Sequence, residues 1–279
     1  AGKSVSNITN DDFNKEKPVP YSARSDYHDL QELKDITDDS LIDETIQRVP
    51  SPKLDAIASD KSSGDDISRL SGLCYAGDFS KAFVFADNIY QKFKKNAAYW
   101  NQVGSCYFLK KDLRKARLFY QKAIELKKNY APPFNNIGAI HLVNGHYEKA
   151  LAAFKKAESL GGKSLTPTYN LSQVYLNFGI VNQAKNGFSK IEKTRGGDPG
   201  VLNGLAISSL FQGQVNRAIQ YYEQINPQLF EKDLFGINYA VALKLSGNQD
   251  AAEKIIRNVE VSRRWESYYK KVRSFVRTR

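Results

Sequence analysis

A period of 34 residues runs through this sequence. Glycine marks it at five positions, and an alanine follows each slot five residues later without exception. The glycines are Gly77, Gly145, Gly179, Gly213 and Gly247, with Lys111 in the remaining slot, and the alanines are Ala82, Ala116, Ala150, Ala184, Ala218 and Ala252. A unit of this length is a helix–turn–helix that cannot bury its own apolar face and must stack on its neighbours. The period therefore predicts an all-α solenoid rather than the two globular domains that 279 residues would otherwise suggest.

Within each period the apolar residues follow helical spacing on both sides of the glycine turn. In residues 97–130 the first helix is predicted to carry Trp100, Gly104 and Tyr107 on one face, and the second to carry Ala116 and Tyr120. The small residues let two helices approach closely, and the aromatic rings fill the space beside them. Each repeat is therefore predicted to be a pair of amphipathic helices of about a dozen residues each.

These residues resemble the tetratricopeptide repeat family. The family pattern W-x2-L-G-x2-Y…A-x3-F is matched by Trp100, Val103, Gly104, Tyr107, Ala116 and Tyr120, and again by Phe134, Ile137, Gly138, Ala150 and Phe154. The resemblance covers about 200 of 279 residues and implies a right-handed superhelical solenoid of antiparallel helix pairs. Six repeats are expected, over 63–96, 97–130, 131–164, 165–198, 199–232 and 233–266.

The first repeat departs most from the family pattern. Leu70 stands in the close-packed column that holds Gly104 and Gly138, so this repeat is expected to be a degenerate cap. The proline that usually ends each repeat of the family is absent. Glycine pairs at 161–162 and 196–197 are expected to bend the chain instead, because a helix C-terminus favours left-handed backbone.

Two segments flank the repeats. Residues 1–62 form an acidic arm with 8 Lys/Arg against 13 Asp/Glu, and apolar spacing predicts one or two short helices between 27 and 49. Residues 63–279 hold 33 Lys/Arg against 17 Asp/Glu. Residues 261–279 are predicted to form a basic amphipathic helix whose apolar stripe holds Val261, Trp265, Tyr268, Val272 and Phe275. We expect this helix to cap the last repeat, and the alternative is peripheral contact with an anionic membrane.

The acidic arm predicts an intramolecular contact. Its charge complements the basic body, and its apolar residues (Leu30, Leu33, Leu41 and Ile46) need somewhere to be buried. We expect residues 27–50 to dock on the solenoid. They would compete with partners if they lie in its groove, and would cap it if they lie against the first repeat. An arm that does neither is only a tether.

The sequence leaves the cellular compartment open. It has no apolar run of about 18–20 residues, so no transmembrane helix is expected. It has no methionine, which favours a processed protein of the bacterial periplasm or envelope over the cytoplasm, unless Ala1-Gly2 is a cloning remnant. Two cysteines without a C-x-x-C pair predict neither a zinc site nor a disulfide framework. Cys106 is expected to be inert packing, and Cys74 to face the groove.

No catalytic or cofactor site is expected. Residues 157–164 (AESLGGKS) fit a relaxed phosphate-loop pattern, but a helix rather than the required strand is predicted to precede them. His141 occupies a packing column and His146 a turn, and neither has a second metal ligand one helical turn away. No nucleophile elbow or isolated carboxylate pair is present. The chain is therefore predicted not to be an enzyme and to need no cofactor or metal.

The family resemblance implies that the first helix of each repeat lines a concave, protein-binding groove. The residues expected to face it are Asn101, Ser105, Phe108, Leu109, Asn135, Ala139, Leu142, Val143, Tyr169, Gln173, Leu176, Asn177, Asn203, Ile207, Leu210 and Phe211. Members that bind the acidic C-termini of heat-shock chaperones use Lys and Arg in these columns, and repeats two to five have none. Apolar side chains flanked by amides suit an apolar or amphipathic segment of a partner protein. The alternative is that Phe108, Leu142 and Leu210 only pack repeat against repeat.

The predicted function is a non-catalytic scaffold that holds a partner protein within a multi-protein assembly. A bacterial envelope secretion or pilus system is one setting that the family's use suggests. The alternative is a nucleic-acid-binding solenoid that uses basic second helices, chiefly Lys110, Lys111, Arg114, Lys115, Arg117, Lys122, Lys127, Lys128, Lys155, Lys156 and Lys163. Because the aromatic residues fall in packing columns rather than beside these cations, nucleic acid is the less favoured partner.

Overall fold

The computed structural model describes residues 66–278, apart from 162–164, 195 and 264. The acidic arm (1–62), its expected helices and its expected docking at 27–50 lie outside the described residues. The described helices fall into two compact units that divide between Pro167 and Thr168. Within the described ranges the only β-structure is an isolated bridge between Lys232 and Glu260. The fold class is all-α, as expected.

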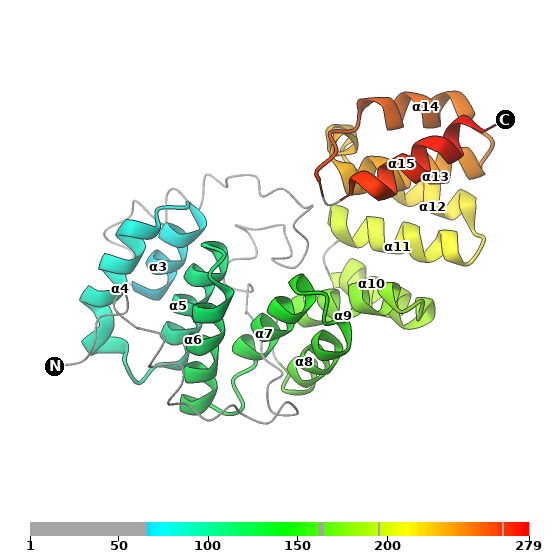
Figure 1. Cartoon of the computed structure of the whole chain (residues 1–279). Coiled ribbons are helices and arrows are strands. Elements are labelled where there is room, and N and C mark those ends of the chain that lie inside the picture. The colour runs from blue at the N-terminus through cyan, green and yellow to red at the C-terminus, as the bar shows by residue number, and fades with distance from the viewer. Residues whose placement is uncertain (1–65, 162–164, 195, 264, 279) are drawn as a thin grey trace. The chain divides into compact units, whose positions relative to one another are not determined.

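Unit 1 is built from three helix pairs, coloured cyan to green in Figure 1. They are α3 (Asp66–Tyr75) with α4 (Phe79–Phe93), α5 (Ala97–Leu109) with α6 (Leu113–Leu126), and α7 (Pro132–Val143) with α8 (Tyr147–Ser159). The first helix α5 packs against its partner α6 and also against α3 and α7, the first helices on either side. The pairs therefore stack in the manner expected of a solenoid.

Unit 2 holds three further pairs and a final helix. They are α9 (Thr166–Asn177) with α10 (Val181–Thr194), α11 (Pro199–Phe211) with α12 (Val215–Tyr222), α13 (Asp233–Leu245) with α14 (Gln249–Asn258), and α15 (Glu266–Arg277). Helix α12 is shorter than the expected dozen residues, and a 3-10 helix η3 (Pro227–Glu231) follows it. Pro227 has no backbone N–H and cannot continue an α-helix, so the chain cannot stay α-helical through this position.

The turn between the helices of each pair has left-handed backbone at the periodic glycine slot. The φ angles of the five glycines lie between 70° and 87°, and Lys111 takes the same conformation with a φ of 67°. This region is strained for a side chain with a Cβ, so Lys111 shows that the turn geometry imposes the conformation. The same geometry accounts for Gly161 and Gly197, at 74° and 84°, which end their helices. In residues 157–164 a helix, α8, precedes the glycines, as the argument against a phosphate loop requires.

The alanine column lies at the contact between paired helices. All six alanines are completely buried. A Cβ added to Gly104 would lie 2.6 Å from the ring of Tyr120, and one added to Gly138 would lie 2.6 Å from the ring of Phe154. Small residues in these columns are therefore needed for the aromatic rings of the second helices to pack against the first.

The two cysteines of unit 1 form a disulfide, which corrects the sequence-based expectation. Cys74 of α3 is bonded to Cys106 of α5, and their Cα atoms are 5.1 Å apart. Both are buried, at 2% and 1% exposure. Cys74 therefore does not face a groove, and Cys106 is not merely inert packing. The spacing of 32 residues is close to one repeat, so the side-by-side packing of α3 and α5 brings the two cysteines within disulfide reach.

Helix α15 packs against α13 and α14 at the C-terminal end of unit 2. Val272 and Val276 are buried in that contact. Phe275, expected on the apolar stripe, is instead 41% exposed, because Val276 takes the inward position beside Val272. None of the helices in the described part of the chain is long and apolar enough to span a bilayer.

Candidate partner-binding surface

The first helices of all six described pairs end at the same position of the 34-residue period. We call this set the end column: Tyr75, Leu109, Val143, Asn177, Phe211 and Leu245. Each is followed by the turn that leads to the second helix. The sixteen predicted groove residues all lie on α5, α7, α9 and α11, four on each helix.

In unit 1 most of the predicted groove residues are buried. Asn101, Ser105 and Phe108 of α5 are at most 8% exposed, and Asn135, Ala139 and Leu142 of α7 are at most 7% exposed. Only Leu109 and Val143, at the end column, are partly accessible. Burial of Phe108 and Leu142 agrees with the alternative in which these two side chains pack repeat against repeat.

The buried amides of unit 1 link successive first helices but keep unused hydrogen-bonding capacity. Asn136 Nδ2 donates to Asn101 Oδ1 at 2.9 Å. Asn101 Nδ2, Gln102 Oε1 and Asn136 Oδ1 are buried and have no hydrogen-bond partner. Leaving a buried donor or acceptor unsatisfied costs about 1–3 kcal/mol. Because these three atoms are buried, they are not accessible to a partner protein in this structure.

In unit 2 more of the hydrogen-bonding groups of the corresponding amides have partners within the fold. Asn203 Oδ1 accepts from the Tyr222 hydroxyl at 3.1 Å and from Asn238 Nδ2 at 3.5 Å. On α9, Gln173 Nε2 donates to the Tyr169 hydroxyl at 3.0 Å, and Asn177 Nδ2 donates to the Gln173 carbonyl at 3.3 Å. The polar residues predicted on α9 thus bond to one another along the helix.

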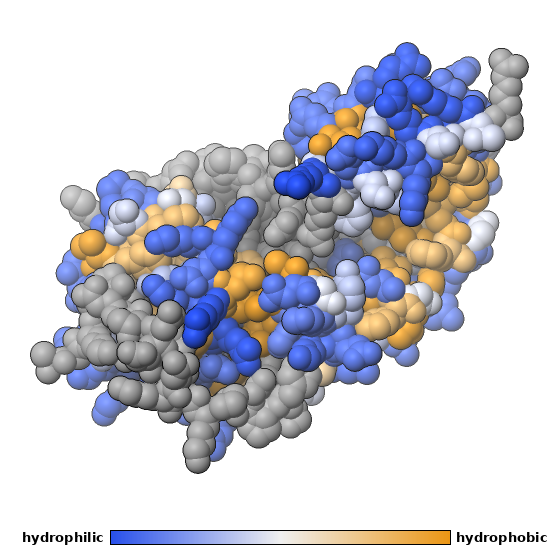
Figure 2. All heavy atoms as spheres, in the orientation of Figure 1, coloured by the Kyte–Doolittle hydropathy of each residue, from blue (hydrophilic) through white to orange (hydrophobic). Residues whose placement is uncertain are grey.

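The apolar predicted residues of unit 2 are the accessible ones. Leu176, Ile207 and Leu210 are half-buried. Phe211 is 64% exposed, and Leu245, one period later in the end column, is 50% exposed. Apolar side chains reach the surface of this unit, seen as orange patches in Figure 2. Because α11 and α13 pack against each other, Phe211 and Leu245 belong to neighbouring helix ends.

Many of the basic residues considered for nucleic-acid binding have partners within unit 1. Lys110 lies 5.4 Å from the Phe83 ring centroid and Lys115 5.3 Å from that of Tyr107. Lys122 pairs with Glu125 at 2.9 Å. These contacts are those of a solvated helix surface with local cation–π and ion-pair interactions.

One repeat is recognised by a family model. Residues 97–130 match the model of the tetratricopeptide repeat, and helix pairs with the same turn geometry extend on both sides of that range. Residues 97–130 are a tetratricopeptide repeat, and the described helix pairs build the fold of tandem repeats of this kind. No curated protein matches its sequence. The fold that these repeats build is one that supports protein–protein interaction.

Solved structures of other proteins share the fold of this chain. The APC/C hetero-tetramer Cut9-Hcn1 has a TM-score of 0.65 at 16% identity, covering 79% of this chain and 44% of that chain. PilF of Pseudomonas aeruginosa has a TM-score of 0.62 at 19% identity, covering 75% and 96%. PilW, described as a type IV pilus biogenesis factor, has a TM-score of 0.60 at 16% identity, covering 79% and 100%. The protein spans less than half of the first of these chains, and identities this low show the fold alone.

Sequence reasoning missed one accessible residue that the period itself identifies. The predicted set stopped at the fifth repeat and so left out Leu245, although it stands exactly one period after Phe211. Extending the column to α13 would have found it.

Proposed function

We propose that this protein is a non-catalytic scaffold that binds an apolar or amphipathic segment of a partner protein at the ends of the first helices of unit 2. The observation that carries the proposal is the exposure of Phe211 and Leu245, at 64% and 50%. Aromatic and aliphatic side chains of this size are the usual anchors of protein interfaces. Leu176 of α9 and Ile207 and Leu210 of α11 are half-buried apolar residues of the same unit.

A partner segment of this kind needs partners for its backbone as well as its side chains. Asn177 of α9, which also stands in the end column of unit 2, is exposed, and its amide can pair with a backbone group. The predicted groove residues of α9 and α11 include no Lys or Arg that could bind a carboxylate. The chemistry therefore favours an internal segment of the partner over an acidic C-terminus.

The proposed setting is a bacterial envelope assembly, such as a secretion or pilus system. The Cys74–Cys106 disulfide supports it, because disulfides persist in oxidising compartments such as the periplasm and are rare in the cytosol. The fold likeness to PilF and to PilW supports the same setting more weakly. Thiol labelling of the protein taken from its source, with and without prior reduction, tests the compartment. Labelling of both cysteines before reduction would contradict it.

Site-specific photocrosslinking tests the binding surface. A photoreactive phenylalanine analogue at Phe211 should crosslink one defined partner in the native source. The same analogue at Val84 is the control, because Val84 is 62% exposed on α4 and lies outside the proposed surface. Equal crosslinking to the same partner from both positions would contradict the proposal.

Charge substitution measures how much this surface contributes to the affinity for the partner. Phe211→Asp combined with Leu245→Asp should weaken binding of that partner about 30-fold or more, since an interface anchor contributes about 2 kcal/mol or more. Both positions are at least half exposed, so the fold should survive. Leu142→Asp would not serve, because Leu142 is 7% exposed and the change would test folding instead. Unchanged affinity in the folded double variant would move the site to another surface.

A further inference from the structure

Helix α15 is held on unit 2 by contacts that fix its orientation. The Tyr268 hydroxyl donates to Asn238 Oδ1 of α13 at 2.9 Å, and the Tyr269 hydroxyl donates to the Ile256 carbonyl of α14 at 3.2 Å. At the far end, Lys244 Nζ donates to the Thr278 carbonyl at 2.5 Å. With Val272 and Val276 buried between these bonds, α15 presents one constant face outward.

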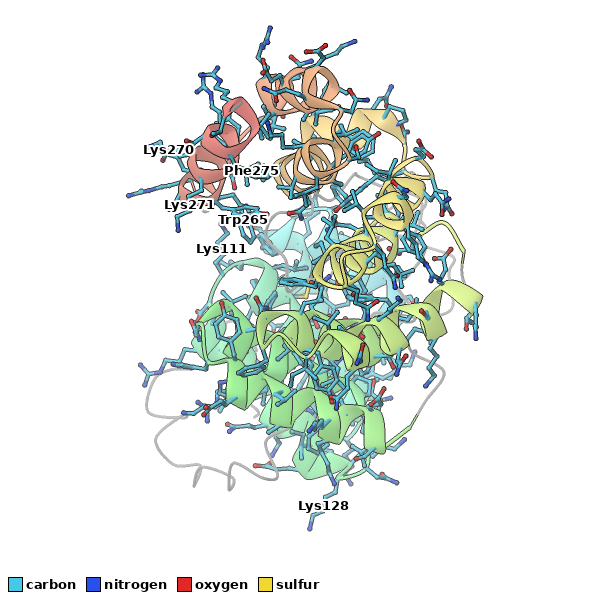
Figure 3. All side chains as sticks on the ribbon, turned by 90° about the vertical axis from the view of Figure 1, so that its right-hand side faces the viewer. Lys111, Lys128, Trp265, Lys270, Lys271 and Phe275 are labelled. Atoms are coloured by element: carbon cyan, nitrogen blue, oxygen red, sulfur yellow. A yellow bond between two sulfur atoms is a disulfide. The ribbon has the colours of Figure 1, made fainter. Side chains whose placement is uncertain are left out.

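The outward face of α15 is strongly basic. Between residues 263 and 279 the sequence has seven Lys/Arg against one acid, Glu266, a balance of +6. Lys270, Lys271, Arg273 and Arg277 of this helix are all exposed. Lys270 and Lys271 project from the outer side of α15 in Figure 3. Among the described residues, the ion pair on this face joins Lys270 to Glu266 at 2.6 Å, and the four cations of the helix outnumber its one acid, so the face keeps a net positive charge.

An apolar side chain borders this basic face. Phe275 is 41% exposed, and it follows Lys271 by one helical turn, which places the two on adjoining positions. Trp265, half-buried, stands at the N-terminal end of the same helix. Aromatic side chains at the edge of a cationic helix face are the pattern of elements that adsorb to anionic lipid surfaces.

We propose that the outer face of α15 docks unit 2 onto an anionic phospholipid surface. Lys271, Arg273 and Arg277 would contact the phosphate headgroups, and Phe275 would enter the interfacial region beside them. This role is independent of the partner surface on α11 and α13. It also gives the exposed Phe275 an explanation that capping of the last repeat does not supply.

Lipid fits this face better than nucleic acid does. Single-stranded nucleic acid is held in a basic groove with several aromatic stacking platforms. Here Lys270, Arg273, Ser274, Arg277 and Thr278 line only an open, shallow depression on one helix. Of the aromatic side chains of α15, only Phe275 is exposed. An open cationic face with an apolar edge matches a broad anionic surface.

Vesicle co-sedimentation of the full chain tests the proposal. The protein should sediment with vesicles of phosphatidylcholine that contain phosphatidylglycerol, and not with phosphatidylcholine alone. Raising the ionic strength to about 1 M, where the screening length falls to about 3 Å, should release it. Failure to bind the anionic vesicles at low salt would overturn the proposal, as would equal binding to both kinds of vesicle.

Matched variants locate the surface. Lys271→Ala with Arg277→Ala should lower vesicle partitioning about 30-fold, since each cation near the surface contributes about fivefold, and Phe275→Ala should lower it severalfold. Lys190→Ala with Lys193→Ala is the control, because it removes the same charge from exposed positions of α10. An equal loss in the control would show that only net charge matters. A single-stranded oligonucleotide that binds more tightly than the vesicles and loses affinity in the α15 variant would assign the face to nucleic acid. Either result overturns the proposal.

Discussion

Reduction of the Cys74–Cys106 disulfide should destabilise unit 1 by about 4 kcal/mol. The bond closes a loop across a separation of 32 residues, and the chain-entropy relation for a loop of that length gives about 3.7 kcal/mol at 25 °C. The reduced wild type tests the crosslink alone, because both sulfur atoms stay in place. A Cys74→Ala/Cys106→Ala variant adds the loss of two buried sulfur atoms and should be less stable still.

The two tryptophans allow the effect to be measured unit by unit. Trp100 lies in unit 1, where it stacks on Phe119 with ring centroids 5.7 Å apart, and Trp265 lies in unit 2. Urea unfolding of a Trp265→Phe variant therefore reports unit 1 through Trp100 fluorescence, and Trp100→Phe reports unit 2. The reductant should shift the Trp100 transition to lower urea and leave the Trp265 transition nearly unchanged.

Two results would refute this reasoning. If oxidised and reduced protein share the same Trp100 transition, the bond does not constrain unit 1. If the Cys74→Ala/Cys106→Ala variant responds to reductant as the wild type does, the shift has another cause.

Four further outcomes are expected. Ala150→Leu and Ala184→Leu should each lower the unfolding free energy by about 1–3 kcal/mol in urea titrations. Both alanines are fully buried, and added methylenes overpack the contact between the paired helices. Unchanged stability in both variants would contradict the 34-residue register of the repeats. Lys111→Gly should raise stability by about 0.5–1 kcal/mol by relieving its positive φ, and a loss would mean that the Lys111 side chain contributes more than the backbone strain costs. Burial, and then the charge of Asp112, raises the pKa of Tyr107 from 10.0 to about 12. The folded state therefore keeps a proton that the unfolded chain releases, and stability should fall as pH rises from about 10 to 12, less so in Tyr107→Phe. Deletion of residues 1–60 should raise the affinity for the partner if the acidic arm competes with it, or lower the melting temperature alone if the arm caps the solenoid. If neither quantity changes, the arm is only a tether.

The repeat architecture was predictable because its signals are periodic. The glycine slot indicates a left-handed turn, and the alanine column indicates a close contact between two helices. Both geometric requirements recur in every repeat. Lys111 shows that a requirement can persist where the residue that signals it is missing. Pro227 signals the interruption after α12 as well. The 34-residue period continues on both sides of it, however, so the pattern still predicts a regular helix pair there.

The candidate site was less predictable, because a period locates a column without saying how deeply it is buried. Leu142 and Leu176 occupy the same column, yet the first is 7% exposed and the second is half-buried. Burial depends on neighbouring side chains that differ between repeats. The disulfide was missed for a related reason: its spacing is two residues short of the period, so its cysteines stand in different columns and meet only across α3 and α5. Phe275 was misplaced because Val276 beside it competes for the same inward position.

The Cys74–Cys106 bond also decides which helices would bear load if the protein were pulled by its two ends. Tension that enters α3 passes at Cys74 directly through the sulfur atoms to Cys106 in α5. Helix α4 lies wholly inside the closed loop, between those two residues. It would therefore carry no force, however far the rest of the chain were stretched, until the bond was reduced. Helices such as α14 are not bypassed by a disulfide and would carry the applied force. In the oxidised protein under load, residues 75–105, which include α4 and most of α5, would stay out of the stretched path, and reduction would add them to the extensible part of the chain.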